Sequence, residues 1–161
     1  MTVKKLPILL CLLAFIAVNA RAQSRGSGFH GVGPRLGFTL NPDQFHLGGQ
    51  LDLGDITPGL MMVPNLEIGV GDHITTVAPS FELDYRFRTN WSAWTPYLGG
   101  GTGPIFYSYA YGDSQTDLGV YIQGGLSRRM LSNTGFFFVE FKLGLVDAPD
   151  AKFTVGWTFG K

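Results

Sequence analysis

Two short segments of this chain contain residue types that occur in hydrolase active sites. Gly112-Asp113-Ser114 has the form of a serine nucleophile block, and Ser127 and Ser132 lie in a second polar segment. A catalytic serine needs a general base, usually a histidine, which follows the nucleophile in enzymes with such a block. No histidine occurs after His73, and Gly-Asp-Ser is also common in turns. The sequence therefore predicts that the protein is not an enzyme.

The sequence gives equally little support for a cofactor site or a metal site. The glycine-rich residues 99–103 lack the Gly-Lys-Ser/Thr ending of a phosphate-binding loop, and no helical pattern follows them. His30, His46 and His73 do not have the spacing of metal ligands. We expect no cofactor and no bound metal.

Two charged pairs remain as surface candidates. Asp113 and Asp117 offer the carboxylate oxygens that calcium prefers, although paired acids in an exposed loop are usually only solvated. Arg128 and Arg129 either contact lipid phosphates at a membrane interface or cap a turn. The sequence leaves both alternatives open.

The first 22 residues have the pattern of a secretory signal peptide. Lys4 and Lys5 precede an apolar run over residues 6–18, and Ala20-Arg21-Ala22 fits a cleavage site. The run is shorter than the roughly 20 residues of a spanning helix. We expect residues 1–22 to be removed, together with the only cysteine, and residues 23–161 to form one domain. Its net charge of −3 gives no electrostatic case for nucleic-acid binding.

The composition points away from a soluble surface. Charged residues make up 15% of the chain, whereas a soluble domain typically carries about 25%. After residue 22, no stretch is long and apolar enough to be a spanning helix. A secreted chain of this kind can still cross a membrane as a barrel that is apolar outside and polar inside.

Side chains alternate between apolar and polar along most of the mature chain. In residues 77–87, for example, Phe81 and Leu83 share one face of an extended chain, and Glu82 and Asp84 share the other. Eight segments separated by turn residues can be extended in this way: 33–40, 45–54, 60–70, 77–87, 96–111, 116–126, 136–145 and 152–159. We cannot assign the two faces of the glycine-rich fifth segment. The sequence predicts an all-β fold, a single eight-stranded antiparallel up-and-down transmembrane β-barrel with short loops.

Periodicity alone does not decide which face points inward. A soluble lipocalin-like barrel has its apolar face inside, whereas a membrane barrel has it outside. The scarcity of charges outside the strands and the 23 glycines, many of them on the polar face, favour the membrane arrangement. Glycine in a strand interior needs a packing reason, and a narrow lumen provides one.

Charged residues on the polar faces form the one constellation for which we predict a role. They are Arg35, Asp52, Glu67, Glu82, Asp84, Arg86, Glu140, Lys142 and Lys152. In a narrow barrel these charges must pair or meet water, because an isolated buried charge is very costly. Five acids and four bases nearly balance, so we expect a salt-bridge network that closes the lumen. A selectivity filter is disfavoured because eight strands enclose little more than side chains.

The chain also resembles a known family of proteins. The segments GPRLGFTL (33–40), PYLGGGTG (96–103) and FTVGWTFGK (153–161), behind a signal peptide, are similar to those of small outer-membrane β-barrels, the OmpA-like transmembrane domains and porin-like barrels. One departure is that Gly160 and Lys161 follow Phe159, whereas such barrels usually end on an aromatic residue. The resemblance implies a monomeric outer-membrane protein of a Gram-negative cell envelope. It also implies membrane lipid, lipopolysaccharide and the outer-membrane assembly machinery as partners.

From these observations we expect a structural or surface-interaction role. The alternatives are a narrow channel or carrier for a small solute, and a soluble periplasmic or secreted lipocalin-like barrel that binds an apolar ligand. With both termini in the periplasm, the turns facing outside are 41–44, 71–76, 112–115 and 146–151. Those facing the periplasm are 55–59, 89–95 and 127–135. An aromatic girdle near the periplasmic boundary is then expected from Phe87, Trp91, Trp94, Trp157 and Phe159.

Overall fold

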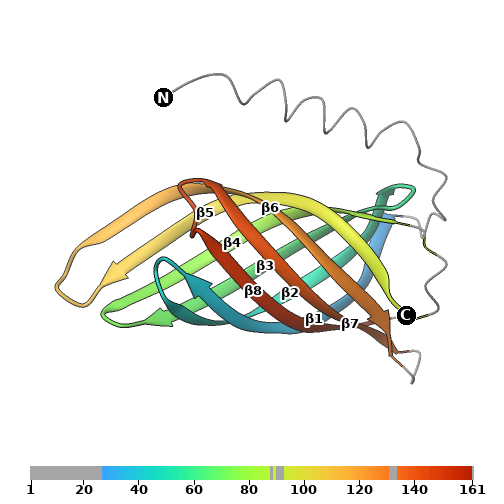
Figure 1. Cartoon of the computed structure of the whole chain (residues 1–161), viewed down its shortest axis with the longest axis horizontal. Coiled ribbons are helices and arrows are strands. Elements are labelled where there is room, and N and C mark those ends of the chain that lie inside the picture. Colours follow the sequence, from blue (N-terminus) through green and yellow to red (C-terminus); the bar gives the residue numbers. More distant parts are fainter. Residues whose placement is uncertain (1–26, 88, 90–92, 131–133, 161) are drawn as a thin grey trace, which may run out of the picture.

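The computed structural model describes residues 27–87, 89, 93–130 and 134–160, so the expected signal peptide, Trp91 and Ser132 lie outside the described residues. The chain forms a closed barrel in which each strand pairs antiparallel with the next and the last pairs with the first (Figure 1). The strands are β1 (Ser27–Leu40), β2 (Gln44–Thr57), β3 (Leu60–Gly71), β4 (Ile74–Arg86), β5 (Thr95–Tyr109), β6 (Ser114–Arg129), β7 (Gly135–Val146) and β8 (Ala151–Phe159). The predicted eight-stranded antiparallel barrel is confirmed.

Most of the strands are longer than the alternating pattern indicated, although β5 ends at Tyr109 rather than at residue 111. β1 begins at Ser27 rather than at residue 33, and β6 continues to Arg129 rather than ending at residue 126. The prediction that Asp55 lies in a turn is wrong. Asp55 belongs to β2, opposite Met61, and is 2% exposed. The reason is a register shift between Gln50 and Asp55, where a bulge changes the direction of the side chain.

The two faces of the wall have opposite polarity. Large apolar side chains point outward, as in Phe38 and Phe81, which are both 62% exposed. Charged side chains point inward, as in Arg35 and Glu82, which are 0% and 1% exposed. This is the inverse of a soluble barrel with an apolar interior and the arrangement of a barrel in lipid. In β5, whose faces the sequence left unassigned, Tyr97 points inward and Leu98 outward.

The barrel closes through a close approach of β1 and β8. A Cβ atom on Gly33 or Gly37 would collide with the backbone carbonyl oxygen of Trp157 or Phe153 on the facing strand. Glycine is therefore required at both positions because the two backbones leave no room for a side chain. No helix among the described residues is long and apolar enough to span a membrane.

Both ends of the described chain lie at the same end of the barrel, as an even number of strands requires (Figure 1). The turns at the opposite end are tight. They occupy residues 41–43, 72–73, 110–113 and 147–150 between consecutive strands. Gly112 has a φ of 96°, the left-handed conformation of a turn glycine, so Gly112-Asp113-Ser114 is turn chemistry.

Candidate functional site

The centre of the lumen is occupied by the Arg35 guanidinium. It lies among three carboxylates from three other strands: Arg35 Nη2 to Glu140 Oε1 measures 2.6 Å, Arg35 Nη1 to Glu82 Oε2 3.3 Å, and Arg35 Nε to Glu67 Oε1 3.0 Å. The last contact is an ion pair without a hydrogen bond. Arg35 is fully buried, so these carboxylates replace the water that a guanidinium normally contacts.

Two lysines compensate the remaining negative charge. Lys142 on β7 forms an ion pair with Glu82, and its Nζ lies 3.5 Å from Glu140 Oε1 and 3.8 Å from Glu67 Oε1. Lys152 on β8 forms an ion pair with Glu67. The three cations and three glutamates form one connected cluster, which we call the charged network.

Neutral polar side chains hold the carboxylates of the charged network in place. The Tyr97 hydroxyl donates to Glu140 Oε2 (3.0 Å), and the Tyr121 hydroxyl donates to Glu82 Oε1 (3.0 Å). Gln123 Nε2 donates to Asp84 Oδ1 (2.6 Å) and to Glu82 Oε2 (3.3 Å). A buried polar cluster is stabilising only when its members are satisfied, and these donors supply hydrogen bonds that the cations do not.

A further polar layer joins β2 to the closure of the barrel. The ring of His46 lies between two threonines, with Nδ1 at 3.0 Å from Thr39 Oγ1 and Nε2 at 3.1 Å from Thr154 Oγ1. Thr39 is on β1 and Thr154 on β8. His46 therefore acts as a hydrogen-bonding link between strands, and all eight strands contribute a buried polar side chain to the lumen.

Arg86 lies apart from the charged network, closer to the end that holds the termini. It forms an ion pair with Asp55, and its side chain is 18% exposed. The sequence placed Arg86 on the polar face but did not identify this partner, because the alternating pattern stops before the bulge in β2. Asp52, at the same end, accepts a hydrogen bond from the backbone N–H of Gly54 (2.8 Å).

Three buried carboxylates, those of Glu82, Asp84 and Glu140, come within 4.8 Å of one another. Oxygen clusters of this kind suit a small cation. Arg35 and Lys142 already contact Glu82 and Glu140, however, so most of this negative charge is compensated by the protein itself.

Glycines provide the space that the large lumen side chains fill. A Cβ atom on Gly125 would collide with the ring of Tyr97, one on Gly101 with Tyr121, and one on Gly156 with the ring of Phe138. A narrow barrel cannot accommodate a large side chain on every strand at one level. These collisions are the packing reason for the glycines on the polar face.

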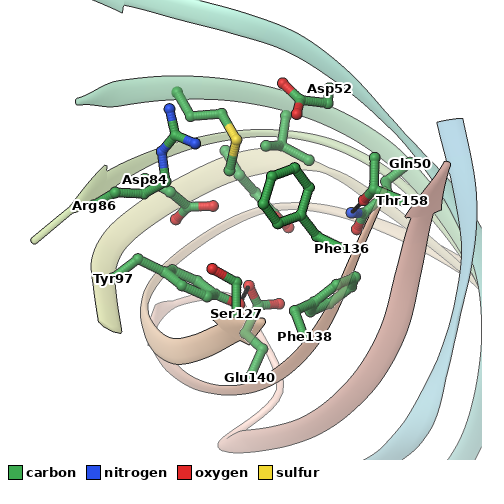
Figure 2. Close-up of a pocket in the computed structure, with 13 residues that line it drawn as sticks. Gln50, Asp52, Asp84, Arg86, Tyr97, Ser127, Phe136, Phe138, Glu140 and Thr158 are labelled. Carbon is green, nitrogen blue, oxygen red and sulfur yellow. Dashed lines mark hydrogen bonds between the residues drawn. The ribbon is translucent and has the colours of Figure 1, made fainter. Parts of the chain in front are cut away.

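The lumen contains a small cavity beside the charged network. Its volume is about 50 Å³, which holds a few water molecules. Figure 2 shows Asp84, Arg86 and Tyr97 on one side of this space, with Gln50 and Thr158 on the other. Phe136 and Phe138 also line the cavity. The cavity has room for water and for side-chain adjustment.

The other sequence candidates do not assemble into a catalytic centre among the described residues. Ser127 Oγ donates to the backbone carbonyl of Thr95 (3.3 Å). The ring of His73 packs against Tyr111, with the centroids 5.7 Å apart. Asp117 accepts hydrogen bonds from Gln115 at the barrel rim.

The structure places all nine predicted polar-face residues in the lumen and brings six of them together in the charged network. Sequence reasoning missed Asp55 because of the bulge, and Tyr97 because the faces of β5 were unassigned. Tyr121, Gln123 and His46 have polar-face parity, but neutral side chains gave no reason to select them. Adding Asp55 to the nine predicted residues gives six acids and four bases.

Comparisons with known proteins give a structural likeness. No protein-family model matches the chain, and no curated protein matches it. Neisserial surface protein A (NspA) has a crystal structure that is similar with a TM-score of 0.66 and 12% identity, covering 85% of this chain and all of that one. The attachment invasion locus protein Ail of Yersinia pestis, solved with the heparin analogue sucrose octasulfate, gives a TM-score of 0.37 and 15% identity over 82% of this chain and 94% of that one. The likeness to NspA confirms the eight-stranded barrel fold.

Removing the central guanidinium should destabilise the barrel strongly. We expect Arg35→Ala to lower the free energy of unfolding by about 3–5 kcal/mol, because Glu67, Glu82 and Glu140 lose a shared partner in a buried site. Arg86→Ala should cost less, since Arg86 has one partner and is partly exposed. The measurement is urea unfolding in lipid vesicles, followed by tryptophan fluorescence.

The matched control is Arg129→Ala, which removes the same side chain from an exposed position at the end of β6. A loss at Arg35 no larger than that at Arg129 would contradict the role given to the charged network.

Proposed function

We propose that the chain is an integral outer-membrane β-barrel with a structural or surface-interaction role, and that the charged network closes its lumen. The observation that carries this proposal is the inverted polarity of the wall. An outward surface of exposed Phe, Leu, Ile and Val side chains is compatible with lipid and costly in water. A soluble barrel that binds an apolar ligand would need the opposite arrangement.

The shape of the molecule supports a scaffold role rather than an extended adhesive one. The turns opposite the termini contain two to four residues each, so this end offers little surface beyond the strands themselves. The charged network and aromatic rings occupy the lumen beside the small cavity. Both features favour a compact wall element whose contacts are made through its outer face and its rims.

The proposed partners follow from this location. Membrane lipid and lipopolysaccharide would surround the apolar wall, and the outer-membrane assembly machinery would insert the chain after a signal peptide has directed it across the inner membrane. A closed barrel leaves no strand edge for pairing with a second copy. We therefore propose a monomer.

Fractionation tests the proposed location. The protein should be recovered in the outer-membrane fraction, should require detergent for extraction, and should migrate differently in SDS gels before and after boiling because the closed barrel resists SDS. Recovery in the soluble fraction without detergent would contradict the proposal.

Electrical recording tests whether the lumen is closed. Purified protein in planar bilayers should show little or no steady conductance, because the Arg35 and Lys142 ion pairs occupy the cross-section. Protein-free bilayers made in the same detergent provide the baseline. A large and stable wild-type conductance would instead identify a pore for small solutes.

Cysteine labelling tests the orientation of the barrel. Ser114 and Ala93 are both exposed and lie at opposite ends. With the termini in the periplasm, a membrane-impermeant maleimide should label Ser114→Cys in intact cells and Ala93→Cys only after the outer membrane is permeabilised. The reverse result would show that the orientation is wrong.

A further inference from the structure

Arg128 is an exception on the outer wall of the barrel. It follows the outward alternation of β6, in which Leu126 and Arg128 point outward while Ser127 and Arg129 have lumen parity. Among the outward-facing strand positions in the described part of the chain, Arg128 is the only Asp, Glu, Lys or Arg. The side chain is exposed, and no carboxylate of a described residue forms an ion pair with it. Its guanidinium is therefore open to an anion from outside the described part of the protein.

Aromatic side chains from β7, β8 and the residue before β5 lie beside Arg128. Phe137 on β7 is its register partner, and Trp157 on β8 is the partner of Phe137. The Arg128 guanidinium lies over the ring of Trp94, 5.8 Å from its centroid. The rings of Trp94 and Phe137 are 6.3 Å apart, and those of Phe137 and Trp157 are 5.5 Å apart. We call Trp94, Arg128, Phe137 and Trp157 the aromatic row.

The aromatic row marks an edge of the apolar wall. Arg128 is one residue from the end of β6, and Trp94 immediately precedes β5. The next outward level toward the middle of the barrel consists of Leu126, Val139 and Val155, which are consecutive register partners and entirely apolar. Tryptophan favours the level of the lipid headgroups, and the penalty for an arginine on the lipid face falls toward that level. In a barrel that spans a bilayer, a guanidinium at this edge would lie at the level of the lipid phosphates.

We propose that the aromatic row binds the phosphate of a glycerophospholipid in the periplasmic leaflet. The Arg128 guanidinium would donate two parallel N–H hydrogen bonds to the phosphate oxygens, the geometry for which arginine is suited. The ring of Trp94 would hold the guanidinium by a cation–π contact. Phe137 and Trp157 would pack against the glycerol and the first methylenes of the acyl chains.

The distribution of charge between the two rims favours an anionic lipid headgroup at the aromatic row. The turns at the opposite end carry aspartates and no described Lys or Arg, namely Asp43, Asp72, Asp113, Asp147 and Asp150. An anionic headgroup is repelled at that rim and attracted at the rim with the aromatic row. The site goes beyond the proposed function, but its assignment to the periplasmic leaflet rests on the orientation proposed above.

The chain offers a matched pair of variants for the test. Arg128→Gln and Arg129→Gln remove the same charge from adjacent residues, one outside the barrel and one over the Phe136 ring at the lumen mouth. Purified mature protein in non-ionic detergent is titrated with phosphatidylglycerol, and bound lipid is counted by native mass spectrometry. We expect Arg128→Gln to weaken lipid binding by roughly tenfold or more, as the loss of a charge-assisted hydrogen bond predicts. Arg129→Gln should stay close to wild type.

Three further measurements test which features of the aromatic row and of the lipid contribute to binding. Arg128→Lys should recover part of the affinity, because it keeps the charge but not the two parallel hydrogen bonds. Trp94→Ala should weaken binding without a change of net charge. Inorganic phosphate at millimolar concentration should not displace the lipid if the acyl chains contribute to binding.

Equal lipid binding by wild type and Arg128→Gln, or an equal loss in both glutamine variants, would overturn the proposal. Preferential binding of lipid A over phosphatidylglycerol, lost in Arg128→Gln, would also overturn it, since the row would then serve the outer leaflet. The gel shift on boiling is measured for every variant, so failure to form a barrel is distinguished from failure to bind lipid.

Discussion

A guanidinium that is completely removed from water is the constraint around which this barrel is built. Arg35 needs compensating charge on every donor edge, and the three glutamates that supply it come from β3, β4 and β7. Backbone pairing connects only adjacent strands. The side chains in the lumen connect strands across the barrel, so they oppose changes in its cross-section in a way that the backbone ladder does not.

This constraint explains why the interior combines charges with glycines and aromatic rings. The outward wall buries no apolar side chains against one another in the way a protein core does, and well-packed contacts must come from the lumen. Tyr97 and Tyr121 fill that space and also donate to Glu140 and Glu82. Each ring occupies a volume that a glycine on a neighbouring strand leaves free. Replacing such a glycine with a larger residue would displace the tyrosine ring. The glutamate carboxylate would then lose its hydrogen-bond donor.

The alternating pattern of the sequence is enough to predict the fold and the direction of most side chains. Glu82 and Glu140 could be assigned to the interior because apolar residues flank them on both sides in the chain. Residues 99–103 could not be assigned, since glycine has no side chain whose polarity distinguishes two faces. Asp55 could not be assigned either, because a bulge interrupts the period of two.

The pairing of charged side chains across the lumen was harder to predict from the sequence than the direction of the side chains. The partners of Arg35 are 47 and 105 residues away in the chain for Glu82 and Glu140. Which charges meet depends on the stagger between strands, and the composition of the strands does not specify that stagger. The same limit explains why Arg86 was expected in the lumen while its partner Asp55 was not identified.

The adjacent residues Arg128 and Arg129 lie on opposite faces of β6, so this strand contacts both the lumen and the surroundings of the barrel. Arg129 turns toward the lumen mouth and lies over the ring of Phe136, whereas Arg128 turns outward over Trp94. Inside the barrel, the glutamates and Asp55 supply the anions that buried cations need. On the outer wall, the described strands supply no carboxylate to Arg128, which leaves its guanidinium open to an anion from the surroundings. A phospholipid phosphate at the headgroup level is such an anion, and the aromatic rings beside Arg128 fix the level at which the two meet.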